Sequence, residues 1–165
     1  SIYYGGKIPF IRSAEINKTE TELFLTKQGL KNSSAQMVKK GDILVALYGA
    51  NSGDVAISRM GGAINQAILC LETKNNHFVY QFLVCKKDQI VSTYIQGGQG
   101  NLSGKIIKSV TILIPQNEKE QQKIAECLSA ADEMITAQEQ KIEALKEHKK
   151  GLLQQLFPNL EEVAE

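Results

Sequence analysis

Apolar residues recur at alternating steps of four and three along the last third of the chain, and this spacing predicts one long helix. The recurring positions are Ile124, Leu128, Ala131, Ile135, Ile142, Leu145, Leu152 and Leu156, and the same heptad frame places polar residues at Gln138 and Lys149. Asn117 stands three residues before Glu120, close to a capping box, and Pro158 ends the pattern. We expect a helix over 117–157, roughly 60 Å long, and a frayed tail over 158–165.

A stripe this long and narrow favours a coiled-coil seam that pairs the helix with another chain. In such a pair, Gln138 and Lys149 would fix the register or the orientation of the two helices. The alternative is a helix that lies on its own domain. Because the preceding residues form a domain too small to cover such a rod, we predict that all ten seam positions serve dimerisation.

The pattern before residue 117 consists of short apolar runs between turn residues. The run Ile43–Tyr48 is typical of a buried strand, and turns are expected at 40–42 and 49–54. Further strands are expected over 8–12, 55–58, 63–71 and 110–115. A helix capped by Asn75 or Asn76 would bury Phe78, Val79, Phe82, Leu83, Ile90 and Val91. This order of elements predicts the α+β class, with a small twisted-sheet domain over 1–116 followed by the long helix.

Charge divides the chain at the same place. Residues 1–116 carry 13 Lys and Arg against 7 Asp and Glu, a formal charge of +6, whereas residues 117–165 carry −5. A basic domain and an acidic helix indicate two modules with different partners. The basic module suits a polyanion, and the acidic helix suits a protein.

The three cysteines, Cys70, Cys85 and Cys127, show neither metal-ligand spacing nor an even count. They indicate no disulfide framework and no zinc site, and they fit a reducing compartment. No basic and apolar leader opens the chain, and no apolar run approaches the roughly 18 residues of a membrane span. We therefore expect a soluble, cytoplasmic protein without a membrane partner.

The sequence offers little material for catalysis. His77 and His148 lie far apart in different modules, and no Ser/His/Asp, Cys/His or H-E-x-x-H set is present. Asp42 and Asp54 stand in turn segments, where acidic residues are common for conformational reasons. We expect no catalytic site and no metal in this chain.

The glycine-rich stretch GGQGNLSGK, over 97–105, resembles a phosphate-binding loop at first sight. It fails the P-loop pattern, because Gln99 and Ile106 stand where a glycine and a Ser or Thr are required. It also fails the dinucleotide fingerprint from Gly98, whose third glycine is replaced by Ser103. A nucleotide-binding enzyme that uses this loop remains a minor alternative.

Four stretches in order resemble the specificity subunit of type I restriction–modification enzymes: GGKIPFIRSAEI, VKKGDILVALYGANSGDVAI, NQAIL and GGQGNLSGKIIKSVTILIPQNEKEQQKIAECLSAADEMI. The junction is the most specific part, because family members carry a strand ending in Ile-Pro, then Glu-Gln, Ile-Ala and Leu. Here these are Ile114-Pro115, Glu120-Gln121, Ile124-Ala125 and Leu128, and HKKGLLQQLFP resembles a family helix end. The resemblance runs from about Gly5 to Phe157.

The resemblance implies one target-recognition domain over 1–116 and one helical spacer that sets the distance between DNA half-sites. Such a subunit is not itself an enzyme and holds no cofactor. Modification subunits supply S-adenosylmethionine for adenine methylation, and a restriction subunit uses ATP and Mg. The implied partners are therefore double-stranded DNA, these two kinds of subunit and, through the long helix, another copy or a second half-subunit.

Two departures from the family pattern bear on this expectation. Family recognition domains usually begin with a segment upstream of the GGKIPF-like strand, and this chain begins almost on that strand. Full-size subunits have two recognition domains and two helical regions, whereas this chain has one of each. We expect either a half-size subunit that works as a homodimer or the second half of a longer protein. The family favours antiparallel pairing of the helices.

Candidate DNA contacts follow from side-chain chemistry at loops and strand ends. Amides on the glycine-rich loop and near the 49–54 turn can reach base edges, and a tyrosine can stack, although a core role for Tyr48 is the stronger expectation. Asn65 and Gln66 are expected to be structural residues of a strand. Lys27 is a further phosphate candidate, and the predicted DNA contacts are Lys7, Arg12, Ser13, Lys31, Tyr48, Asn51, Ser52, Arg59, Gln99, Asn101 and Lys105.

A rival interpretation from another class is a coiled-coil assembly adaptor whose head binds protein. Such an adaptor would show no salt-dependent affinity for DNA.

Overall fold

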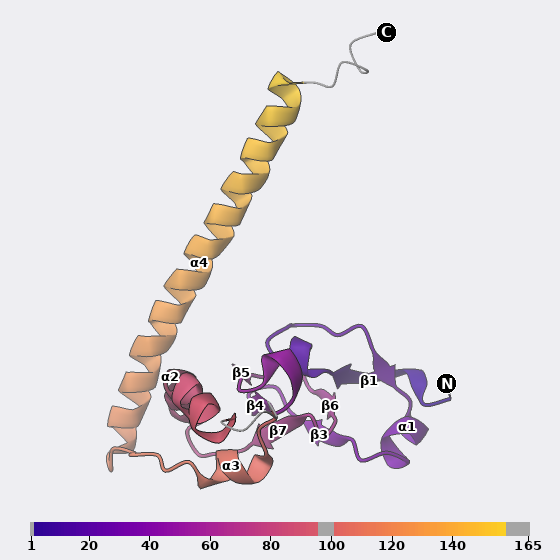
Figure 1. The fold of residues 1–165 in the computed structure, drawn as a ribbon, viewed down its shortest axis with the longest axis vertical. Helices are drawn as coiled ribbons and strands as arrows, with labels where there is room; N and C mark the ends of the chain where they lie inside the picture. Colours follow the sequence, from indigo (N-terminus) through magenta and orange to yellow (C-terminus); the bar gives the residue numbers. More distant parts are fainter. Residues whose placement is uncertain (1, 96–100, 158–165) are drawn as a thin grey trace. The chain divides into compact units, whose positions relative to one another are not determined.

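The computed structural model describes residues 2–95 and 101–157 and has the α+β architecture that the sequence predicts (Figure 1). The chain divides into two compact units, Ser1–Ala125 and Glu126–Glu165. The first unit contains two sheets and most of the helices, and the second consists of the rest of one long helix. The division falls inside that helix, nine residues beyond its expected start at 117.

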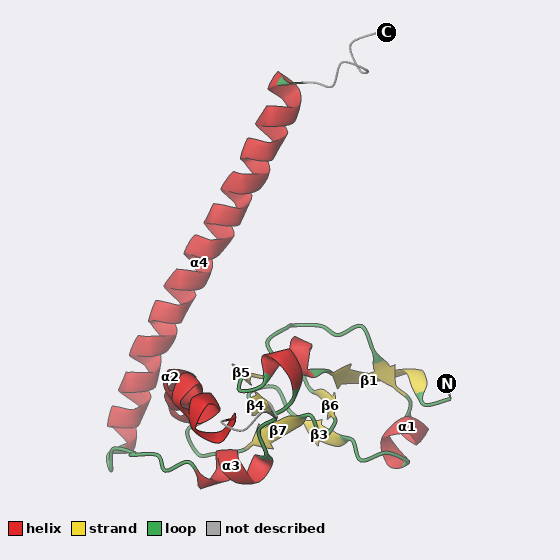
Figure 2. Ribbon diagram, viewed as in Figure 1, coloured by secondary structure: helices red, strands yellow, loops and turns green. Residues whose placement is uncertain are grey.

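Within the described residues, seven strands form two sheets (Figure 2). The strands are β1 (Tyr4–Ile11), β2 (Phe24–Leu25), β3 (Gln36–Val38), β4 (Ile43–Ala46), β5 (Val55–Ile57), β6 (Gly62–Ile64) and β7 (Ile68–Leu71). The four-stranded sheet has the order β2-β1-β6-β3, with β1 and β6 parallel and the other pairs antiparallel. The three-stranded sheet has the order β5-β4-β7 and is antiparallel throughout.

Four α-helices and two short 3-10 helices complete the described part of the chain. They are η1 (Ser13–Glu15), α1 (Lys27–Lys31), η2 (Gly49–Asn51), α2 (Asn76–Ile95), α3 (Gly104–Ser109) and α4 (Glu118–Leu156). Residue types that favour N-cap positions begin two of these helices. At the start of α1, the hydroxyl of Thr26 accepts a hydrogen bond of 2.9 Å from Gly29 N–H. Asn117 likewise accepts from Lys119 N–H at the start of α4, 2.9 Å.

The central strand β4 is buried on both faces, which explains its uninterrupted apolar sequence. Leu44 and Ala46 pack into a cluster with residues of the four-stranded sheet, such as Ile64. Ile43 and Val45 pack on the opposite side against α2 and α3. The first unit therefore has three layers: the four-stranded sheet, the three-stranded sheet, and the helices α2 and α3 (Figure 1).

Two strand predictions were wrong. The expected strand over 63–71 is interrupted by a turn, so that β6 and β7 belong to different sheets. The expected strand over 110–115 pairs with no described strand; it follows the unpredicted helix α3, and its residues Val110 and Ile112 pack against the helical core. An apolar run does not reveal by its periodicity whether it passes from one sheet to another or pairs with any strand.

The long helix matches its prediction closely. α4 has 39 residues, and Gly151 lies inside it without ending it. Beyond Ala125 its seam leucines and isoleucines are exposed within this chain; Ile135, Ile142 and Leu145 are 57%, 53% and 58% exposed. No helix of the described residues is long and apolar enough to cross a membrane.

Candidate nucleic-acid interface

Three loops meet at the carboxyl end of β4. The carbonyl oxygen of Leu47 accepts hydrogen bonds from Leu102 N–H and from the Ser52 hydroxyl, each 2.9 Å long. The N–H of Leu47 donates to the carbonyl of Ala67, 2.8 Å away. One residue thus joins the β4–β5 loop (47–54), the β6–β7 turn (65–67) and the segment 101–103, which are far apart in the sequence.

The β4–β5 loop projects because two glycines reverse the chain. Gly49 and Gly53 have φ values of 78° and 88°, a region that side chains disfavour. Asn51 closes the turn through its carbonyl, which accepts from Asp54 N–H at 2.9 Å. Tyr48, at the base of η2, is 40% exposed, so the expected core role was wrong and its ring is accessible.

The β6–β7 turn is held by its own side chain. The Asn65 side-chain oxygen accepts from Ala67 N–H at 3.0 Å, so Asn65 is structural as expected, although it stabilises a turn and not a strand. Gln66 is exposed, and its amide oxygen accepts from the Ser34 hydroxyl at 3.4 Å. The turn therefore presents a polar residue next to the projecting β4–β5 loop.

The segment 101–103 is anchored by a buried leucine. Leu102 is 1% exposed, which leaves its neighbour Asn101 on the surface. Ser103 caps α3 by accepting from Ile106 N–H at 3.3 Å, and Lys105 is exposed on this helix. The expected loop therefore becomes helical at Gly104, and its remaining candidate, Gln99, lies outside the described residues.

A buried carboxylate organises the end of β1. Glu15 is 2% exposed; Arg12 Nη2 donates to its Oε1 at 2.6 Å, and the Thr21 hydroxyl donates to its Oε2 at 3.0 Å. The Arg12 side chain, foremost among these groups, lowers the pKa of Glu15 to about 2, and the same bonds raise the pKa of Arg12. Arg12 Nη2 also lies 2.6 Å from Glu22 Oε2, so the guanidinium forms ion pairs with two carboxylates.

The organised η1 segment faces the β4–β5 loop across a pocket of about 330 Å³. Ser13 and Asn17 line one side, Asn51 lines another, and Val84 lies on α2. An ion pair between Lys87 of α2 and Asp54, 2.6 Å long, also lines the pocket. The pocket thus belongs to the same end of the first unit as the three loops.

We call this end of the unit the apical surface and define it by Ser13, Asn17, Tyr48, Asn51, Ser52, Gln66 and Asn101. Four predicted DNA contacts besides Ser13 gather on it or beside it: Tyr48, Asn51, Ser52 and Asn101, with Arg12 just below Ser13 at the strand end. Ser52 donates its hydroxyl to Leu47, so it positions the loop. Sequence reasoning did not select Asn17, and no local signal marks it, because its partners across the pocket are distant in the chain.

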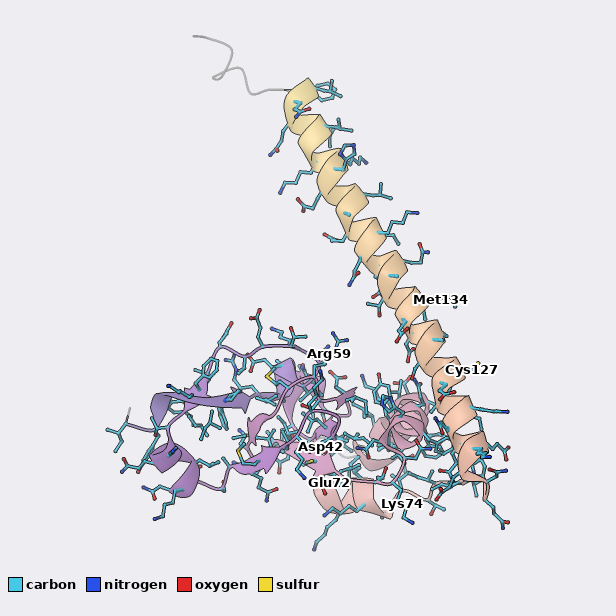
Figure 3. The ribbon with its side chains drawn as sticks, turned by 180° about the vertical axis from the view of Figure 1, so that it is seen from behind. Asp42, Arg59, Glu72, Lys74, Cys127 and Met134 are labelled. Atoms are coloured by element: carbon cyan, nitrogen blue, oxygen red, sulfur yellow. The ribbon has the colours of Figure 1, made fainter. Side chains whose placement is uncertain are left out.

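The structure places other predicted contacts elsewhere. β5 runs antiparallel to β4, so Arg59, just beyond β5, belongs to the end of the sheet opposite to Leu47. There Ser58 N–H donates to the Asp42 carbonyl at 2.8 Å, and Glu72 follows β7, whose Leu71 pairs with Ile43. Figure 3 labels Asp42 and Glu72. Lys7 lies on β1, and Lys27 and Lys31 lie on α1, which contacts β1 and β2.

The described residues contain no group of three or more His, Cys, Asp or Glu side chains that could hold a metal. Burial raises the pKa of the Cys70 thiol to about 11, and the charge of Asp42, whose Oδ2 lies 3.6 Å from the sulfur, acts in the same direction. A thiol with a raised pKa is a poor nucleophile. What the apical surface offers is hydrogen-bonding amides and hydroxyls around an exposed aromatic ring, which is the chemistry of base recognition.

Comparison with known proteins agrees with this chemistry. A family model described as the type I restriction modification DNA specificity domain matches residues 1–147. The specificity subunit of the type I restriction enzyme MjaVIII from Methanocaldococcus jannaschii is 31% identical over 125 residues, covering 73% of this chain and 29% of the relative. The MjaIX specificity subunit from the same organism is 29% identical over 170 residues, covering 96% and 39%.

Solved structures show the same fold at low sequence identity. A chain from a study of complex assembly and conformational transition of the type I R-M system aligns with a TM-score of 0.71 and 16% identity, covering 93% of this chain and 39% of that one. The HsdS subunit from Thermoanaerobacter tengcongensis aligns with a TM-score of 0.62 and 15% identity, covering 83% and 33%. The chain thus spans between 29% and 39% of the length of these four proteins.

Proposed function

The chain belongs to the family of type I restriction–modification DNA specificity domains, and on this premise we propose that its apical surface reads one half of a bipartite DNA target. The observation that carries the proposal is the junction at Leu47, where three loops bring Tyr48, Asn51 and Asn101 to one end of the unit. Asparagine amides suit adenine, whose major-groove edge offers one donor and one acceptor.

The charge of the first unit supports DNA as the ligand. Residues 1–125 carry a formal charge of +6, and residues 126–165 carry −5. Lys105, which follows the apical segment 101–103, is exposed and suited to a phosphate. Lys7, Lys31 and Arg59 remain predicted phosphate contacts, but their positions away from the apical surface make them weaker candidates for base reading.

The second unit is proposed to set the spacing between two half-sites. Its apolar seam is exposed in this chain, and pairing with another copy or with a second half-subunit would bury it. Gln138 and Lys149, both exposed on α4, would fix the register. Because half-site spacing follows protein geometry, the length of the paired helices would determine the distance between the two recognised sequences.

The proposed role in the complex is non-catalytic. Modification subunits with S-adenosylmethionine, and a restriction subunit with ATP and Mg, would carry out methylation and cleavage. The chain's own contribution would be to position DNA against these partners.

The test compares two ends of one sheet. Asn101→Ala and Tyr48→Ala should each weaken binding to a selected duplex by about 1–3 kcal/mol and relax specificity at particular base pairs. The matched control, Lys74→Ala, removes an exposed side chain near Asn76 at the opposite end and should leave both unchanged. Fluorescence anisotropy measures affinity, and competition with mismatched duplexes measures specificity. Equal effects at both ends would favour non-specific electrostatic binding, and no DNA binding at low salt would favour the adaptor with a protein-binding head.

A further inference from the structure

We propose that the pocket between η1, η2, β5 and α2 accepts a single nucleobase that has left the DNA stack. The proposal rests on the proposed DNA-recognition function and deepens it by naming a ligand for one part of the apical surface. The pocket has a volume of about 330 Å³ and lies between Ser13 and Asn51, two predicted DNA contacts.

The shape of the pocket limits what DNA can place there. The major groove is itself a channel about 12 Å wide, so an element that reads base edges inside it must project from the protein. A hollow in the protein surface can receive only a group that projects from the duplex. On DNA, that group is a backbone phosphate or an extruded base.

Charge favours the base over the phosphate. Of the described residues that line the pocket, only Asp54 and Lys87 are charged, and they neutralise each other in an ion pair of 2.6 Å. A phosphate in the pocket would be repelled by the carboxylate of Asp54, and the charge of Lys87 is already paired with that carboxylate. A neutral heteroaromatic ring meets no such penalty.

The lining suits such a ring. Ile16, Val55 and Val84 supply apolar surface, and Tyr80 supplies an aromatic ring. Asn17 and Asn51 can match the donors and acceptors on the edge of a base. A volume near the lower end of ligand pockets, which span about 300–1,000 Å³, holds one base but not a peptide helix.

Ion pairs within the protein hold the walls of the pocket. Glu15 and Arg12 hold the η1 wall, and the Asp54–Lys87 pair ties the β4–β5 loop to α2. A preformed site requires little reorganisation on binding, so the energetic cost of extrusion lies mainly in the DNA.

Mismatch scanning tests the proposal with the full chain. Duplexes that carry the motif selected from a random pool are prepared with one mismatched or abasic partner at each successive position. An unpaired base is cheaper to extrude, so one position should bind about tenfold more tightly than the intact duplex. 2-Aminopurine placed at that position should become more fluorescent when the protein binds.

A substitution that fills the pocket with a large side chain tests the proposal most sharply. Val84→Trp should abolish the gain in affinity for the duplex mismatched at that position. Gln89→Trp, at an exposed residue of the same helix outside the pocket, should retain this gain. If the wild-type chain binds its motif but no position shows the gain or the fluorescence rise, the pocket proposal is overturned and the recognition function stands. A gain that persists in a folded Val84→Trp protein overturns it as well. Failure of the wild-type chain to bind any DNA overturns both proposals.

Discussion

The two units of the chain use apolar residues in opposite ways. In the first unit Leu44, Ile64 and Leu83 are at most 2% exposed, because they lie in the two core clusters between the sheets and helices. In the second unit Ile142 and Leu145 occupy regular seam positions yet are more than half exposed. The same residue types are thus buried inside one unit and exposed to solvent in the other.

This difference predicts that the first unit is stable by itself and that the helix of the second unit depends on association with another chain. The core of the first unit should make its unfolding independent of protein concentration, as in an autonomous domain. If the helix beyond Ala125 pairs as proposed, its stability should depend on mass action. Three substitutions, each with a control, test this contrast.

Leu44→Ala should destabilise the first unit by about 2–5 kcal/mol, because it removes buried methyl groups between the two sheets and leaves a cavity. Denaturant unfolding followed by circular dichroism at several protein concentrations measures the effect. Leu113→Ala, at an 85% exposed leucine in the same unit, should cost less than about 0.5 kcal/mol. Equal costs for the two variants would contradict the assigned core.

Ile142→Lys should weaken self-association at least about a hundredfold, close to 3 kcal/mol, because a charge would be buried in the paired seam. The unfolding of the first unit should not change. Gln140→Lys adds the same charge outside the seam and serves as the control for sedimentation analysis. A wild-type chain that stays monomeric at high concentration would remove the homodimer, leaving only pairing with a different half-subunit.

Glu15→Gln should lower the stability of the first unit by about 1–3 kcal/mol at neutral pH, a range that allows for the partial exposure of Arg12. The pKa of Glu15 is lowered from 4.5 to about 2, so its contribution is complete above pH 4.5 and is lost as the pH falls towards 2. The difference between wild type and variant should vanish over the same interval. Glu22→Gln, at a 78% exposed partner of Arg12, should cost less than about 1 kcal/mol.

How far the sequence predicts the structure depends on how local each signal is. The helix α4, the strand β4 and the helix α2 each have a continuous local pattern of apolar residues, and all three elements were predicted correctly. The segments 63–71 and 110–115 were misassigned because an apolar run does not say which sheet it joins, or whether it joins one.

Single residues of the candidate site could be selected from the sequence, but their proximity in space could not be predicted from it. Asn51 and Asn101 were selected for their chemistry, yet their proximity depends on the hydrogen bonds of Leu47 to segments some 20 and 55 residues away. Arg59 has side-chain chemistry that suits a DNA contact, and only the antiparallel direction of β5 places it at the other end of the sheet. The pocket wall at Asn17 required the buried network of Glu15, which no sequence motif marks.

Selection from a random duplex pool shows whether the first unit reads DNA sequence, as proposed. The chain is mixed with the pool, the bound fraction is sequenced, and the affinity of the enriched duplexes is titrated with salt. The account predicts an enriched motif of a few base pairs and an affinity that falls steeply with salt. Two such motifs at fixed spacing would add support for the paired helices. Salt-dependent binding without any enriched motif, or no binding at low salt, would contradict the claim.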